Sequence, residues 1–215
     1  MGRVKLGILG GTFDPPHVGH LTLAGTALEH LSLDEVLFVP AGQPWRKEGR
    51  EITAAEHRLA MVRLAIEGMD RFTASDIEVR RPGPSYIVDT LAELLATYGP
   101  ATELYLILGE DALMDMPTWK EPQRIVALAW LAVALRSRAR ELDLTEVEAA
   151  IPGISRRLIV LPMSFVDVSA TAIRAWASKG ASLEGLVPPP SNPTSAPTPS
   201  TASVDRLTSC SAGGI

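Results

Sequence analysis

The order of apolar segments along the chain limits the fold to one class. Six apolar runs of strand length alternate with stretches in which apolar residues recur at helical spacing. We expect strands at 4–9, 34–40, 72–79, 103–108, 130–135 and 157–161, and helices at 21–31, 54–68, 86–98, 143–150 and 169–179. This alternation predicts an α/β fold, with a doubly wound, mostly parallel sheet and helices on both faces. Ligands of such sheets bind at the carboxyl ends of the strands, near a change in strand order.

Length and composition place the boundary of the folded part near residue 187. The chain has 215 residues, enough for one domain with a full core, which we expect to span 1–187. Residues 188–215 are rich in Pro, Ser and Thr, and Asp205 and Arg206 are their only charges. A segment of this kind holds little that could form a core, so we expect a disordered tail. A mucin-like stalk is the alternative, but nothing else in the sequence suggests secretion.

Charge and cysteine content exclude several classes of protein. A net charge of −5 argues against a general nucleic-acid-binding surface, which would be basic. Cys210 is the only cysteine, which rules out an intrachain disulfide and argues against a zinc cluster. The sequence shows neither a membrane-length apolar run nor a signal-peptide layout. We therefore expect a cytoplasmic protein with no membrane partner.

The stretch 10–20, Gly-Gly-Thr-Phe-Asp-Pro-Pro-His-Val-Gly-His, joins the first predicted strand to the first predicted helix. Its paired glycines let the backbone approach a ligand closely, and a helix start favours an anion. His17 and His20 lie three residues apart, about one helical turn, so both can face the same ligand. The combination suits a polyphosphate. The alternative is a surface turn with two incidental histidines. The stretch contains neither a Walker A lysine motif nor a G-x-G-x-x-G fingerprint.

This stretch resembles the H-x-G-H signature of the nucleotidyltransferase superfamily. Its eleven-residue form, G-G-T-F-D-P-P-H-x-G-H, is similar to that of the bacterial nicotinate-mononucleotide adenylyltransferases. The resemblance implies a Rossmann-like fold and transfer of the adenylyl group of ATP to nicotinate mononucleotide, giving nicotinate adenine dinucleotide and pyrophosphate in NAD biosynthesis. It implies that His17 and His20 are catalytic and that Gly10, Gly11, Thr12 and Phe13 bind ATP. It also implies Mg²⁺ held mainly by the ATP phosphates. The sequence leaves the oligomeric state open, with a homo-oligomer as one alternative.

Two further segments resemble the nucleotide-binding motifs of this family. The run 168–174, Val-Ser-Ala-Thr-Ala-Ile-Arg, is similar to I-S-S-T-x-I-R, which implies that Ser169, Thr171 and Arg174 grip the triphosphate. Ala170 departs from the motif and puts one hydroxyl contact in doubt. By itself the run is also typical of an N-cap followed by an exposed arginine. Gly109 and Asp111 match the turn G-x-D-x-L, which lies close to both nucleotides in the family, and the resemblance implies that they bind ATP.

A third group of residues resembles the mononucleotide site of the family. Residues 81–91 are similar to R-x-G-x-S-Y-T-x-D-T-L, with Ile87 in place of the threonine. The resemblance implies that the mononucleotide contacts Ser85, Tyr86, Thr90 and Trp119, the last by stacking on the pyridine ring. In the loop 43–47 the family commonly has P-P-H-K, so Lys47 matches a catalytic lysine that approaches the phosphates. Trp45 replaces the histidine and is expected beside the mononucleotide.

These residues leave three activities open. The mononucleotide phosphate would attack the α-phosphorus of ATP in line, so no protein nucleophile is needed. The enzyme could prefer the nicotinate or the nicotinamide mononucleotide, or accept both. A catalytically weak nucleotide sensor is the alternative from another class, prompted by Ala170, Trp45 and the polar tail. All three require that His20 and Arg174 border one cleft.

Overall fold

The computed structural model describes residues 4–45, 51–135, 142–164 and 168–188. Six parallel strands form one sheet in the order β3-β2-β1-β4-β5-β6. The strands are β1 (Lys5–Gly11), β2 (Glu35–Pro40), β3 (Phe72–Ala74), β4 (Glu103–Gly109), β5 (Ala129–Leu135) and β6 (Leu158–Ser164). The chain winds outward from β1 to β3 and then returns to the other side of β1 as β4, so the strand order reverses between β1 and β4. The predicted doubly wound α/β fold is confirmed.

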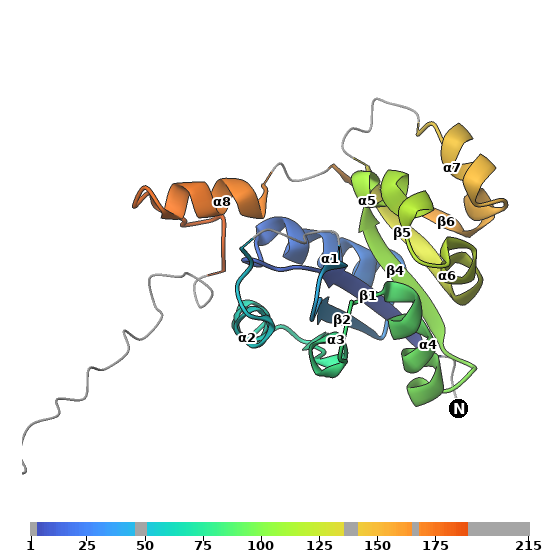
Figure 1. Ribbon diagram of the computed structural model, residues 1–215, viewed down its shortest axis with the longest axis horizontal. Coiled ribbons are helices and arrows are strands. Elements are labelled where there is room, and N and C mark those ends of the chain that lie inside the picture. The colour runs from blue at the N-terminus through green and yellow to red at the C-terminus, as the bar shows by residue number, and fades with distance from the viewer. Residues whose placement is uncertain (1–3, 46–50, 136–141, 165–167, 189–215) are drawn as a thin grey trace, which may run out of the picture.

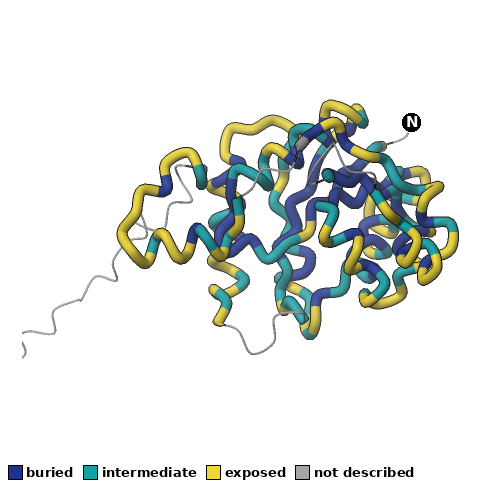
Figure 2. The backbone as a smooth tube through the Cα atoms, turned by 90° about the horizontal axis from the view of Figure 1, so that it is seen from above, coloured by how far each residue is buried: buried dark blue, intermediate teal, exposed yellow. Residues whose placement is uncertain are grey.

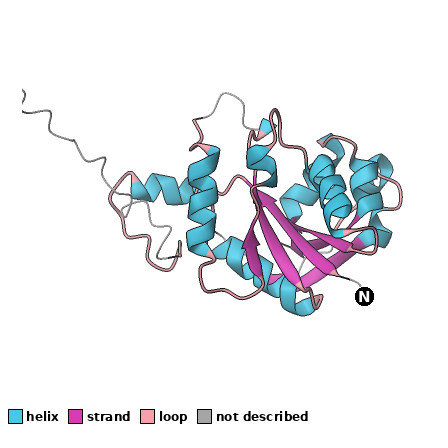
Figure 3. Cartoon of the chain, turned by 90° about the horizontal axis from the view of Figure 1, so that it is seen from below, coloured by secondary structure: helices cyan, strands magenta, loops and turns pink. Residues whose placement is uncertain are grey.

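The central strands are continuous apolar runs because helices cover the sheet on both sides (Figure 3). On one face, α1 (Val18–His30) and α2 (Ala55–Ala65) pack on side chains such as Phe38 and Ile107. On the other face, α4 (Ile87–Tyr98), α6 (Pro122–Leu128) and α7 (Thr145–Ala150) pack on Leu6, Leu106 and their neighbours. Figure 2 shows the resulting buried layer through the middle of the molecule.

The last helix, α8 (Ala170–Ala177), lies to one side of the sheet rather than on it (Figure 1). Its buried residue Ile173 packs with Leu183 and Val187 in a small cluster separate from the two sheet layers. The segment is tied to the start of α1, where the Val18 N–H donates to the Leu186 carbonyl at 3.0 Å. This attachment brings the second predicted nucleotide motif to the glycine-rich turn. The disordered tail was expected over 188–215, and all of it but residue 188 lies outside the described residues.

Two expectations about local structure were wrong. The strand predicted over 72–79 ends at Ala74, and α3 (Ile77–Arg80) follows, because Ser75 and Asp76 accept hydrogen bonds from Ile77 and Arg80 backbone N–H groups. Tyr86, not Ser85, occupies the N-cap of α4. The short helices α5 (Glu110–Asp115), η2 (Met116–Thr118) and η3 (Ile154–Arg157), together with α6, were not expected.

The prediction that Ser169 caps the last helix is confirmed, since its Oγ accepts from the Ala172 N–H at 3.2 Å. Among the residues that the structure describes, none of the helices has the length and apolar character needed to span a membrane.

Candidate active site

Two cavities adjoin at the carboxyl edge of the sheet, where the strand order reverses. The first, of about 290 Å³, is lined by three aromatic residues, and we call it the aromatic cavity: Trp45, Tyr86 and Trp119. The second, of about 320 Å³, is lined by two histidines, and we call it the histidine cavity: His17 and His20. Gly10 and Leu108, at the ends of β1 and β4, line both. The fold therefore provides two adjacent compartments, with Gly10 and Leu108 on their common boundary, at the place that doubly wound sheets use for ligands.

The two histidines are held against each other at the start of α1. His17 has an extended backbone and forms the N-cap, and His20 follows one turn later. Their rings stack with centroids 3.7 Å apart, and the edge of Phe13 meets the His20 ring at 4.8 Å. The His17 backbone N–H donates to His20 Nδ1 at 3.2 Å. This bond assigns the proton of a neutral His20 ring to Nε2, which makes that nitrogen the donor.

His17 is one of the few buried polar side chains, with 8 % of its surface exposed. Burial lowers its pKa to about 4, so the ring is neutral at pH 7. Its Nδ1 atom is buried and makes no hydrogen bond within the part of the chain that the structure describes. A buried polar atom without a partner costs free energy, which a ligand in the cavity could recover.

The start of α8 forms the far wall of the histidine cavity. Val168, Ser169 and Ala170 line it together with the histidines. From the next turn of α8, Arg174 Nη1 donates to the Asp14 carbonyl in the glycine-rich turn, and Nη2 lies 3.5 Å from Thr171 Oγ1. The structure therefore brings the two predicted phosphate-binding segments together, although Thr171 and Arg174 stand beside the cavity and do not line it.

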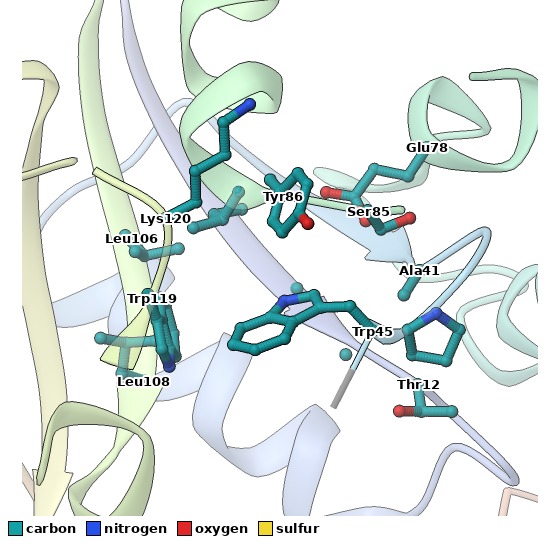
Figure 4. A pocket seen from close by; sticks show the side chains of 14 residues that line it. Thr12, Ala41, Trp45, Glu78, Ser85, Tyr86, Leu106, Leu108, Trp119 and Lys120 are labelled. Carbon is teal, nitrogen blue, oxygen red and sulfur yellow. The ribbon is translucent and has the colours of Figure 1, made fainter. Parts of the chain in front are cut away.

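The aromatic cavity is a slot between indole rings (Figure 4). Trp45 and Trp119 face each other across it, and the Tyr86 ring lies 5.9 Å from that of Trp45. The Trp119 Nε1 atom is buried without a hydrogen-bond partner among the described residues. Lys120 places its ammonium 4.8 Å from the Tyr86 ring centroid and pairs with Asp89 at 2.9 Å. The slot thus combines flat apolar walls with a cation at its edge.

A buried carboxylate, that of Glu78, lines the tyrosine side of this cavity. Thr90 Oγ1 donates to Glu78 Oε1 at 2.6 Å and accepts from Arg81 Nη1 at 2.9 Å. Burial raises the pKa of Glu78 above its usual value. The hydrogen bonds from Thr90 and Ser85 and the nearby Arg81 offset this effect only in part. Thr90, which was predicted to contact the mononucleotide, does not line the cavity; its fully buried side chain donates to Glu78, which does.

The remaining predicted residues divide between the cavities and the core. Gly10, Gly11 and Thr12 line the aromatic cavity, and Gly109 lines the histidine cavity. Phe13 and Asp111 line neither: Phe13 is 2 % exposed and packs in the core under His20, and Asp111 lies on the exposed side of α5. Their predicted contacts with ATP through side chains gain no support from this placement. Lys47 lies outside the described residues.

Sequence reasoning missed Arg58, Glu78 and Lys120. Arg58, on α2, has 1 % of its surface exposed and donates to backbone carbonyls of three separate loops. Burial lowers its pKa, and the nearby carboxylates of Asp14 and Glu56 raise it. The signal available in the sequence was a charged residue next to Leu59 on the apolar side of a predicted helix.

Comparison with known proteins agrees with this geometry. The family profile described as cytidylyltransferase-like matches residues 8–176. A probable nicotinate-nucleotide adenylyltransferase of Thermomicrobium roseum is 48% identical over 184 residues, which are 86% of this chain and 85% of that protein. One from Dehalococcoides mccartyi is 43% identical over 188 residues, 87% of this chain and 92% of its own length.

A solved structure shares the fold at low sequence identity. The nicotinic acid mononucleotide adenylyltransferase of Plasmodium falciparum, complexed with APC, has a TM-score of 0.68 and 20% identity, covering 87% of this chain and 92% of its own. At that identity the likeness concerns the fold alone. The family match and the two bacterial relatives, by contrast, each span most of the chain. This chain therefore belongs to the cytidylyltransferase-like family, in its group of nicotinate-nucleotide adenylyltransferases.

Proposed function

We propose that this chain transfers the adenylyl group of ATP to nicotinate mononucleotide, forming nicotinate adenine dinucleotide and releasing pyrophosphate. The observation that carries the proposal is the pair of adjacent cavities, one walled by aromatic rings and one by stacked histidines at a helix start. A reaction that links two nucleotides needs two such compartments with a common boundary.

ATP occupies the histidine cavity in this proposal. The start of α1 presents the positive end of a helix dipole, which favours phosphate oxygens. His17, neutral because burial lowers its pKa to about 4, serves as a hydrogen-bond donor rather than as a cation. Ser169 and Arg174 approach the triphosphate from α8. Lys47 remains a predicted phosphate contact.

The mononucleotide occupies the aromatic cavity. Its flat pyridine ring fits between Trp45 and Trp119, where ring stacking contributes on the order of 0.5–1.5 kcal/mol beyond burial. The unpartnered Trp119 Nε1 gains an acceptor from the ligand. Lys120 supplies positive charge for the carboxylate of nicotinate, which supports a preference for the acid over the amide.

Catalysis then consists of positioning and charge stabilisation. A phosphate oxygen of the mononucleotide forms a bond to the α-phosphorus of ATP, and the bond from that phosphorus to the bridging oxygen of pyrophosphate breaks. Gly10 lines both cavities without a side chain to separate the reacting phosphates. His20, with Nε2 as its donor, stabilises charge on the phosphate oxygens as the bonds exchange.

Magnesium enters the proposed reaction together with ATP. Among the described residues, no group of three or more His, Cys, Asp or Glu side chains is placed to hold a metal ion. We propose that Mg²⁺ arrives with ATP, bound by phosphate oxygens and water, as is usual for an ion that keeps most of its hydration.

A pyrophosphate-release assay with ATP and each mononucleotide tests the proposal. The expected result is product with both ATP and nicotinate mononucleotide present, at a higher kcat/KM than with the nicotinamide form. Equal values for the two would remove the acid preference. Absence of product with either would leave a nucleotide sensor, the reading that Ala170 in the wall of the histidine cavity favours.

A further inference from the structure

Arg58 is a buried guanidinium whose bonds converge on the turns around the aromatic cavity. Nη1 donates to the Thr12 carbonyl at 2.7 Å, and Nη2 donates to the carbonyls of Ala41 at 2.5 Å and Gly42 at 3.2 Å. Nε donates to the Thr53 carbonyl at 2.8 Å. A charge is expensive to bury unless its donors are satisfied, and here the partners are loop carbonyls from three places in the chain.

The same loop is held from its opposite side by Ser85. The Ser85 Oγ accepts from the N–H groups of Gly42 at 2.9 Å and Gln43 at 3.2 Å, and the Ser85 N–H donates to the Gln43 carbonyl at 2.9 Å. The Ala41 N–H donates to the Gly11 carbonyl at 2.9 Å. With the two bonds from Arg58, all six backbone polar groups of residues 41–43 have partners. A three-residue connection held in this way has little freedom to change conformation.

Residues 41–43 lead directly into the wall of the aromatic cavity. Trp45 follows two residues after Gln43, and its ring lies against that of Tyr86, the residue after Ser85. Gly42 packs so closely on α3 that an added Cβ would lie 2.2 Å from the Glu78 carbonyl oxygen. Arg58 does not line the cavity, so it can affect a ligand only through the turns that it holds.

We infer that Arg58 is a positioning residue that, with Ser85, fixes residues 41–43 and so presents Trp45 as a preformed wall of the aromatic cavity. Its partners Thr12 and Ala41 line this cavity and not the histidine cavity. Loss of the guanidinium therefore weakens binding of the mononucleotide and leaves binding of ATP largely unchanged. This selectivity, though not the fixed loop, rests on the proposed assignment of the two substrates to the two cavities.

The test compares Arg58→Lys with Arg63→Lys in the full-length protein. Lysine keeps the charge but lacks the planar fork that reaches several carbonyls at once. Arg63 is a matched control because it lies on α2 but is exposed. Hydrogen exchange is measured at the amides of residues 42, 43 and 45, with the amides of β4 as the internal reference. Steady-state kinetics then give KM for each substrate.

In Arg58→Lys we expect exchange at the loop amides to accelerate about tenfold or more while β4 is unchanged. The KM for the mononucleotide should rise roughly ten- to hundredfold, as for displaced positioning groups, while the KM for ATP stays within about twofold. Arg63→Lys should match the parent in every measurement. A folded Arg58→Lys protein with parental loop exchange, or with equal effects on both substrates, overturns the inference.

Two further outcomes are decided by other measurements. If Arg58→Lys does not fold, Ser85→Ala carries the test because it releases the same loop from the other side. Faster exchange at residues 42 and 43 with parental β4 then supports the inference, and unchanged exchange overturns it. If the parent has no transferase activity, the proposed function fails, while the exchange measurement still decides whether Arg58 fixes the loop.

Discussion

The guanidinium of Arg174 donates a hydrogen bond to the carbonyl of Asp14, 160 residues earlier in the chain. This contact joins α8 to the glycine-rich turn and places a permanent cation beside the histidine cavity. Since α8 packs in a small cluster of its own rather than on the sheet, this contact and the Val18–Leu186 hydrogen bond align the two phosphate-binding segments.

Replacement of Arg174 by Met should raise the KM for ATP by about tenfold or more, since a charge-assisted hydrogen bond contributes roughly 1.5–3 kcal/mol. The KM for the mononucleotide should change little. Initial-rate kinetics with each substrate varied in turn measure both values. Lys179→Met, at the exposed end of the same segment, is the control for charge alone. Equal increases for the two substrates would contradict the placement of the triphosphate.

His20→Ala should lower kcat by roughly two orders of magnitude, the usual loss when one preorganised donor to a transition state is removed. His30→Ala, an exposed histidine at the other end of α1, should retain parental activity. Single-turnover measurement of pyrophosphate release separates the chemical step from product release. A His20→Ala protein within twofold of the parent would show that the ring is a packing element only.

The burial of His17 makes stability depend on pH. Its pKa is about 4 in the folded protein and about 6.5 when unfolded, so the unfolded chain binds more protons between these values. The resulting stability is present above pH 6.5 and is lost as the pH falls toward 4. We expect a loss of about 2 kcal/mol in the free energy of unfolding between pH 7 and pH 5 from this group.

Urea denaturation at several pH values, compared with His17→Gln, isolates this contribution. Glutamine does not titrate, so the difference in stability between parent and variant should shrink as the pH falls from 7 to 5. A difference that is constant over this range would mean that His17 is accessible to protons in the folded state.

Lys120→Met should reduce the preference for nicotinate over nicotinamide mononucleotide by about two- to fivefold, the effect of one partly exposed charge. The change should come from slower reaction of the acid, with the amide little affected, because only the acid carries a charge on its ring substituent. The ratio of the two kcat/KM values is the measured quantity. An unchanged ratio would assign acid recognition to other groups, such as the start of α4.

Gly42→Ala should destabilise the protein by about 1–3 kcal/mol, because the new methyl group would overlap the Glu78 carbonyl oxygen. Gly25→Ala is the matched control: it lies inside α1 with no heavy atom within 4 Å of the added Cβ, so it should be neutral or stabilise by roughly 0.5–1 kcal/mol. Thermal unfolding of the two variants measures the contrast. Similar melting temperatures for both would show that the loop can shift away from α3.

The features that could be predicted from the sequence are those that depend on residues close together in the chain. Alternating apolar runs specified the sheet, and the turn between Gly10 and His20 showed both its glycines and its donors. The elements between Glu110 and Leu128 escaped prediction because each is only one or two turns long, too short for a helical period to stand out.

Arg58 and Thr90 show what a sequence pattern cannot reveal. The role of Arg58 depends on carbonyls of Thr12, Ala41 and Thr53, which only the folded chain brings to one point. Thr90 belongs to a stretch that resembles a mononucleotide motif, yet its hydroxyl donates to Glu78, and Glu78 rather than Thr90 lines the cavity. Spacing placed Thr90 near the site, and packing decided which way it points.

Gly10 lines both cavities, so a single residue without a side chain marks the boundary between them. A molecule that spans this boundary makes both sets of contacts for one loss of translational freedom. We therefore expect the joined dinucleotide to be held more firmly than either half that formed it. Release of the dinucleotide, rather than bond formation, is then expected to limit the rate of each catalytic cycle.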